Sequence, residues 1–151
     1  ALGAWEQSGM NAHWHAPDGT AFPFSQWGDP AEARATALFV HGMGGAPTDF
    51  DPLGEHLAAL GVAGFAPTVR GQGLDPDPSR RGFFLKPDTI ASDLSAFATS
   101  IHQPGKPLFM CGESLGALLL AWALANHTPF PETKGLIFSA PVVALSKDTH
   151  P

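Results

Sequence analysis

The sequence has little cysteine, few basic residues and no long apolar run, and each shortage excludes a class of protein. Cys111 is the only cysteine, so no internal disulfide can form and nothing requires an oxidising compartment, which favours the cytoplasm. Lys and Arg number 8 against 14 Asp and Glu, too few for a surface that binds nucleic acid. The longest apolar run, 115–124, falls well short of the roughly 18 residues that span a bilayer. We therefore predict a soluble protein with no nucleic-acid partner and no membrane span.

What is present indicates one globular domain, because 44% of the 151 residues are hydrophobic and only 15% are charged. Strands are expected at 13–15, 21–27, 36–41, 62–69, 108–111 and 135–140, and helices at 51–60, 88–102 and 115–126. The first two strands flank the turn triplet Pro17-Asp18-Gly19 and predict a hairpin, in which Pro23 suits only an edge strand. The helix at 51–60 has Asp51 as its expected N-cap and leucines at helical spacing.

Short apolar runs that alternate with helices are typical of parallel strands buried on both faces. The predicted fold class is therefore α/β, with a mostly parallel sheet, helices on both of its faces and an N-terminal antiparallel hairpin. In such sheets, functional residues gather at the carboxyl ends of the strands. A long loop, 70–87, follows one of these strand ends, and long loops in compact domains are often functional.

The pentapeptide Gly112-Glu113-Ser114-Leu115-Gly116 joins an apolar strand to an apolar helix. This context indicates a nucleophile elbow with Ser114 as the attacking residue, because the turn exposes the hydroxyl. Gly112 and Gly116 lack the Cβ atoms that would keep the strand and the helix apart. The alternative is a structural turn in which Ser114 only caps the helix.

A second glycine-rich segment, His41-Gly42-Met43-Gly44-Gly45, follows the strand at 36–41. Its backbone can direct the Met43 N–H toward the same site, where it would form an oxyanion hole with the Leu115 N–H. Gly42 and Gly44 would give this loop its freedom, although a tight turn without a catalytic role has the same composition. His41 is expected to be a structural histidine bonded to nearby backbone, not a general base.

The motifs HGMGG, RGQG (70–73) and GESLG, in this order and each after a strand, resemble the α/β-hydrolase superfamily. Within it, they are similar to the branch of monoacylglycerol lipases, lysophospholipases and serine aminopeptidases, from about His13 to Leu145. The resemblance implies a Ser–Asp/Glu–His triad in that order and a lid after the sixth strand. The implied chemistry needs no metal and no organic cofactor.

The sequence departs from this family after the strand at 135–140, which would be the sixth. Residues 1–151 are therefore expected to form the N-terminal part of a single α/β-hydrolase domain, without the lid and the C-terminal strands. Asp148 follows the sixth strand, where some lipases carry the acid, but no later strand is present to deliver a histidine. We expect a C-terminal fragment or a second chain of the same domain to supply the Asp or Glu and the His.

Three other features have plain structural interpretations. Cys111 lies on a buried strand and is expected to be a core residue, because a buried thiol without a cationic neighbour is unreactive. Arg80 and Arg81 are expected to form a solvated patch, with substrate contact as the alternative. His13 and His15 share one face of a strand, but no third ligand accompanies them, so no metal site is predicted.

The sequence leads to one functional hypothesis and two alternatives. The first is a serine hydrolase that cleaves carboxylic esters, such as lipid-like substrates with apolar chains, through a Ser114 acyl-enzyme. A peptide or amide hydrolase of the proline-iminopeptidase type shares every motif. A non-catalytic domain that keeps the fold only for binding belongs to a different class, and labelling by a fluorophosphonate probe separates it from the enzymes.

Overall fold

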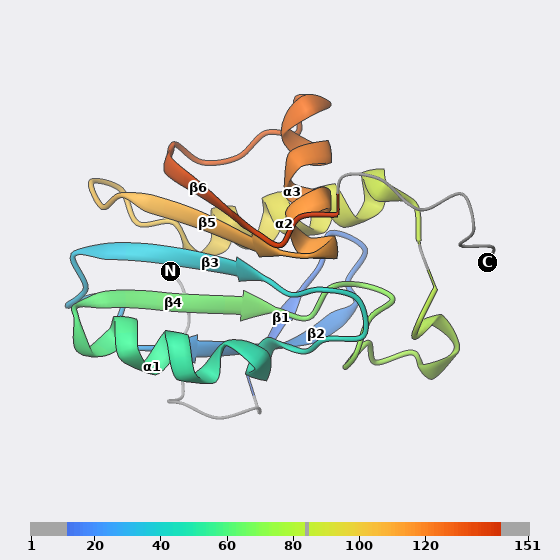
Figure 1. The fold of residues 1–151 in the computed structure, drawn as a ribbon, viewed down its shortest axis with the longest axis horizontal. Coiled ribbons are helices and arrows are strands. Elements are labelled where there is room, and N and C mark those ends of the chain that lie inside the picture. The colour runs from blue at the N-terminus through green and yellow to red at the C-terminus, as the bar shows by residue number, and fades with distance from the viewer. Residues whose placement is uncertain (1–11, 84, 143–151) are drawn as a thin grey trace.

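The computed structural model describes residues 12–83 and 85–142, which form one six-stranded sheet with the order β1-β2-β4-β3-β5-β6. The strands are β1 (His13–His15), β2 (Ala21–Trp27), β3 (Ala35–Val40), β4 (Val62–Pro67), β5 (Leu108–Glu113) and β6 (Thr133–Ser139). β1 and β2 are antiparallel to their neighbours, whereas β4, β3, β5 and β6 run parallel, as their arrowheads show (Figure 1). The predicted mostly parallel sheet with an N-terminal hairpin is thus confirmed.

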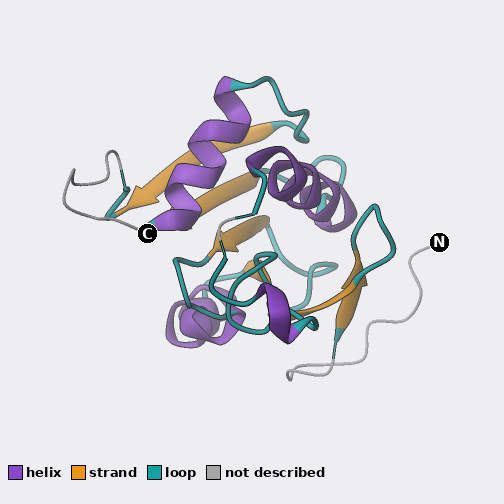
Figure 2. Ribbon diagram, turned by 90° about the vertical axis from the view of Figure 1, so that its right-hand side faces the viewer, coloured by secondary structure: helices purple, strands orange, loops and turns teal. Residues whose placement is uncertain are grey.

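Helices cover both faces of this sheet. The three α-helices are α1 (Asp51–Ala59), α2 (Pro87–Ile101) and α3 (Leu115–Ala125), and two short 3₁₀ helices are η1 (Pro47–Phe50) and η2 (Pro78–Arg80). α1 lies on one face, and α2 and α3 lie together on the other (Figure 2). None of the helices in the described parts of the chain has the length and apolarity to cross a membrane.

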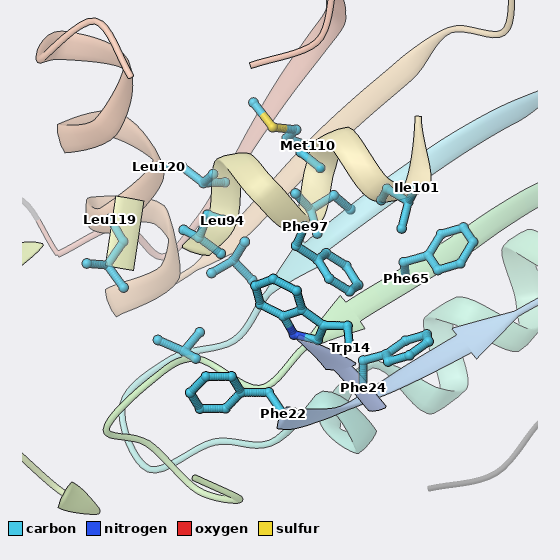
Figure 3. Packing of buried hydrophobic residues seen from close by; sticks show 14 of the residues in the cluster. Trp14, Phe22, Phe24, Phe65, Leu94, Phe97, Ile101, Met110, Leu119 and Leu120 are labelled. Carbon is cyan, nitrogen blue, oxygen red and sulfur yellow. The ribbon is translucent and has the colours of Figure 1, made fainter. Parts of the chain in front are cut away.

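The larger core lies beneath α2 and α3 and is rich in aromatic rings. Phe97 of α2 meets Trp14 edge to face with ring centroids 5.1 Å apart, and Phe24 in the same way at 5.6 Å (Figure 3). Burying each such ring contributes on the order of 2–3 kcal/mol. These contacts attach the N-terminal hairpin to the parallel sheet, because β1 and β2 supply two of the three rings.

The smaller core lies on the α1 face, where the first helix differs from its prediction. Asp51 is not an N-cap but the first helical residue, and its carboxylate accepts a hydrogen bond of 3.1 Å from the Trp27 indole N–H. Leu53 and Leu60 are exposed, although their spacing is helical. The helix instead rests on Gly54, where a Cβ would overlap the Trp27 ring. The bulk of the indole therefore requires a glycine on the buried side, where of the three leucines only Leu57 packs against the core.

Pro23 also lies elsewhere than predicted, because β2 is paired on both sides and is not an edge strand. The pairing of β2 with β4 runs from Phe24 to Trp27, so Pro23 lies just beyond that ladder and pairs with His13 of β1 on the other side. Its carbonyl still accepts a hydrogen bond from the Thr68 N–H at 3.0 Å. The missing proline N–H therefore costs the sheet little.

β6 lies at the opposite edge of the sheet from the hairpin. Its side chains Leu136, Ile137 and Phe138 are all exposed, on both faces of the strand. The described residues therefore leave an apolar strand open along one edge and on both faces, which is uncommon in soluble proteins.

Candidate active site

Ser114 lies at the junction of β5 and α3 with a positive φ of 52° and a ψ of −112°. A side chain in this region costs about 1–3 kcal/mol and persists only where the surroundings enforce it. The Ser114 N–H donates to the Ser139 carbonyl at 2.9 Å, which fixes the turn against the end of β6. The hydroxyl makes no hydrogen bond to any residue that the structure describes.

Close approach explains the two glycines on either side of Ser114. A Cβ on Gly112 would lie 2.6 Å from the Ala117 backbone nitrogen, and a Cβ on Gly116 would overlap the Val40 carbonyl at the end of β3. The chain can therefore turn from β5 into α3 only without side chains at these positions. Neither position has room for a side chain, and the role of both glycines in a nucleophile elbow stays a prediction.

The segment 42–45 forms a tight turn beside Ser114. The Gly45 N–H donates to the Gly42 carbonyl at 3.1 Å, and Gly44 has a φ of +70° that favours glycine. A Cβ on Gly42 would overlap the Glu113 carboxylate and lie 3.1 Å from the Ser114 Cβ. The turn thus packs directly on the serine.

His41 orients this turn. Its Nε2 accepts the Val69 N–H at 3.0 Å, so the neutral ring carries its proton on Nδ1, which lies 3.0 Å from the Gly42 carbonyl and donates to it. Burial lowers the pKa of His41, which keeps the ring neutral. The prediction of a structural histidine bonded to backbone is confirmed.

The Gly42 carbonyl accepts two hydrogen bonds, from the Gly45 N–H and from His41 Nδ1. In a trans peptide the next N–H points the opposite way, so the Met43 N–H is directed away from both donors. Leu115 is the first residue of α3, where N–H groups have no partner within the helix. Within residues 12–83 and 85–142, neither of these two N–H groups donates a hydrogen bond to an acceptor.

The loop 70–83 is ordered around the buried carboxylate of Asp75. This carboxylate accepts the N–H groups of Gly71 and Asp77 at 2.7 and 2.9 Å, and forms an ion pair of 2.8 Å with Arg80. Arg81 donates to the Asp75 carbonyl. A buried carboxylate requires charged and N–H partners, which draws Arg80 partly inward. The predicted solvated patch is therefore wrong for Arg80, whereas Arg81 is exposed as predicted.

Arg70, at the start of the same loop, is a second feature that sequence reasoning missed. It pairs with Asp93 of α2 at 2.6 Å and with Asp18 of the β1–β2 turn at 2.7 Å, over the Phe22 ring. Its hydrogen bond holds the pKa of Asp18 well below the usual range, while burial raises the pKa of Asp93. A charged residue directly after a buried strand was the available signal.

Two further predictions concern residues around Ser114. Cys111 packs against the smaller core and burial raises the pKa of its thiol, so its prediction as a core residue is confirmed. Asp148 lies outside the described residues.

Sequence reasoning also overlooked Gln72, whose amide oxygen accepts the Gly44 N–H at 2.8 Å.

Comparison with known proteins agrees with this geometry. Residues 31–151 match the family described as "Serine aminopeptidase, S33". A comparison with curated proteins by sequence gives no match.

Among solved structures, a soluble variant of monoglyceride lipase from Saccharomyces cerevisiae has a TM-score of 0.78 at 24% identity, covering 94% of this chain and 48% of that chain. The monoacylglycerol lipase of Paleococcus ferrophilus has 0.67 at 21%, covering 85% and 46%. An esterase from Exiguobacterium antarcticum has 0.69 at 20%, covering 89% and 46%. The chain thus has the α/β-hydrolase fold and spans about half the length of these structures.

Proposed function

The chain belongs to the serine aminopeptidase S33 family, and we propose that it hydrolyses carboxylic esters with Ser114 as the nucleophile. The observation that carries this proposal is the positive φ of Ser114 at the strand–helix junction. A capping serine needs no such strain, whereas a nucleophile elbow requires it to expose the hydroxyl at the carboxyl end of the sheet.

In the proposed reaction, Ser114 Oγ attacks the ester carbonyl and forms an acyl-enzyme that water then hydrolyses. The negative charge that develops on the carbonyl oxygen is held by the N–H groups of Met43 and Leu115. Both lack an acceptor among the described residues, and both flank the serine. Each donor in such an oxyanion hole typically contributes about 3 kcal/mol to the transition state.

The general base of this reaction is proposed to lie outside the described residues. His41 is bonded on both ring nitrogens, so it cannot take the serine proton. We propose that a C-terminal fragment or a second chain of the same domain supplies the histidine and its Asp or Glu, and pairs with β6. The exposed side chains of Leu136, Ile137 and Phe138 support such a partner, because burial of that surface would be favourable.

Apolar acyl groups are the proposed substrate class. Met43 and Phe83 are 67% and 64% exposed, and they lie on the two segments, 42–45 and 70–83, that the Gln72 side chain joins. Sites that bind hydrocarbon chains are lined mostly by apolar side chains, and Met43 belongs to the turn that packs on Ser114. The neighbouring monoglyceride lipase was crystallised with a substrate analog, which is consistent with ester substrates.

Peptide or amide cleavage is the second candidate, and the name of the matching family favours it. Both reactions use the same nucleophile and oxyanion donors. They differ in the leaving group, so p-nitrophenyl esters and aminoacyl p-nitroanilides distinguish them directly.

The first test replaces Ser114 with Ala in natively purified protein. Hydrolysis of short p-nitrophenyl esters and labelling by a fluorophosphonate should both be lost, because the nucleophile is removed while an alanine adopts the same backbone at similar cost. Ser92→Ala, at an exposed serine of α2, is the control and should leave both readouts unchanged. Wild-type protein that is not labelled would point to the non-catalytic alternative.

A further inference from the structure

Gln72 connects the turn beside Ser114 to the far end of the loop 70–83. Its side chain is buried, with only 2% of its surface exposed. The amide oxygen accepts the Gly44 N–H at 2.8 Å, and the amide nitrogen donates to the Phe83 carbonyl at 3.4 Å. One side chain thus satisfies backbone groups on two separate loops.

The backbone of Gln72 is itself held on both sides. Its N–H donates to the Val69 carbonyl at 3.0 Å, and its carbonyl accepts the Asp75 N–H at 2.8 Å. Asp75 in turn bonds Gly71 and Arg80 through its buried carboxylate. Gln72 therefore projects from a rigid support, and its amide has little freedom to follow a moving turn.

The turn 42–45 needs such a support. Its third residue, Gly44, has a φ of +70°, which is the type II arrangement. A glycine at this position also permits the opposite orientation of the peptide between Met43 and Gly44. The hydrogen bond to Gln72 selects one of the two, because only the present orientation directs the Gly44 N–H at the amide oxygen.

Met43 consequently lies between two anchored groups. On one side, the Gly42 carbonyl is fixed by Gly45 and His41; on the other, the Gly44 N–H is fixed by Gln72. Gly73 closes the contact, since a Cβ there would overlap the Gly45 carbonyl. The Met43 side chain makes no comparable contact, because it is mostly exposed.

We propose that Gln72 is a positioning residue, which holds the turn so that the Met43 N–H faces the oxyanion. This inference rests on the proposed function. Gln72 touches neither the substrate nor Ser114; it acts through the Gly44 N–H. Loss of its acceptor oxygen should weaken binding of the transition state and leave binding of the ester unchanged.

The test compares Gln72→Met with Gln72→Glu in natively purified protein. Methionine keeps the volume and removes the acceptor, so kcat should fall about ten-fold with KM unchanged, less than the loss for deleting an oxyanion donor outright. Inhibition by a trifluoromethyl ketone, which forms an oxyanion adduct with the serine, should weaken by a similar factor. A protonated glutamate can make both bonds of the amide, so the activity of Gln72→Glu relative to wild type should rise as the pH falls.

Gln26→Met is the matched control. Gln26 also donates to a backbone carbonyl, that of Gly28, but it lies on β2. Its loss should change neither kcat nor inhibition. If Gln72→Met is insoluble, Gln72→Ala replaces it and is evaluated in the same way.

Two results would overturn the inference. One is a folded Gln72→Met enzyme with wild-type kcat and wild-type affinity for the trifluoromethyl ketone. The other is a loss of activity that follows a lower melting temperature alone and is not restored in Gln72→Glu. Fluorophosphonate labelling that disappears in Ser114→Ala shows separately that the proposed function holds, so the failure of one idea is not mistaken for failure of the other.

Discussion

Ser114 holds a backbone conformation with a positive φ, which among the described residues other than glycine occurs only at Ser114, His127 and Ala140. The left-handed φ costs about 1–3 kcal/mol, and the glycines at 112 and 116 and the bond to Ser139 offset that cost by enforcing the turn. The turn leaves the partly exposed Ser114 side chain without a capping hydrogen bond to α3. Strain that is held in place at a strand–helix junction is consistent with the proposed role of Ser114 as the nucleophile.

The buried ring of His41 leads to a prediction about how the free energy of unfolding depends on pH. Its pKa in the folded protein lies below the ordinary 6.5 because the ring is buried, so the unfolded chain binds the proton more readily. The free energy of unfolding should be greatest above pH 6.5 and should fall as the pH drops toward the folded pKa, by at most about 1.4 kcal/mol per pH unit. Urea unfolding at a series of pH values measures this slope.

His41→Gln should flatten that slope, because it removes the titrating ring. His56→Gln is the control at an exposed histidine of α1, and it should keep the wild-type slope. Parallel curves for wild type and His41→Gln would show that the buried ring does not cause the loss of stability.

At the scale of elements, the junction of β5, α3 and β3 carries the next prediction. A Cβ on Gly116 would overlap the Val40 carbonyl, and neither backbone can retreat, because β3 pairs with both β4 and β5. Gly116→Ala should therefore destabilise the protein by about 2–4 kcal/mol, at or above the usual cost of overpacking. Thermal or urea unfolding measures the loss.

Gly135→Ala is the matched control for this substitution. There the added Cβ would meet only the edge of the Phe109 ring at 3.0 Å, and that side chain is partly exposed and free to turn. A Gly116→Ala protein as stable as Gly135→Ala would mean that β3 and α3 are not packed as closely as the structure has them.

The positions of these elements could largely be predicted from the sequence, because buried parallel strands and amphipathic helices leave apolar runs of characteristic length and period. The strand before His41 and helix α2, which buries Ile90, Leu94, Phe97 and Ile101 on one face, are examples. The face of α1 could not be predicted, since Gly54 is buried only because Trp27 lies above it. That packing joins positions 27 residues apart, and no local pattern records it.

The candidate site likewise has a part that could be predicted from the sequence and a part that could not. Ser114, Met43 and the neighbouring glycines are contiguous motifs, so their grouping at the carboxyl ends of β3 and β5 could be expected in advance. Gln72 reaches Gly44 across 28 positions, and Asp75 draws Arg80 inward through its burial. Such contacts depend on how a loop closes on itself, which composition does not determine.

At the scale of the whole molecule, β6 is an edge strand of the described sheet that exposes apolar side chains. Three consecutive apolar side chains, 136–138, are exposed there, on both faces of an edge strand. Edge strands of this kind pair readily with other chains. The solved structures of the same fold extend over about twice the aligned length, so a covering partner is in keeping with the fold.

Substitution of Ile137 tests whether a further segment or chain packs on β6. It is 57% exposed in the described structure, and Leu53 of α1 is 43% exposed. By exposure alone, Ile137→Asp and Leu53→Asp should each change stability by no more than about 0.5 kcal/mol, as surface substitutions do. If a further segment or chain packs on β6, the aspartate at 137 becomes a buried unpaired charge and should cost about 3 kcal/mol or more, or abolish soluble expression.

Urea unfolding of natively purified protein compares the two variants, and mass spectrometry under denaturing conditions identifies any companion polypeptide. Equal, small effects at both positions, with a single species present, would show that β6 remains an open edge and would contradict the proposal that a further segment or chain pairs there and supplies the general base.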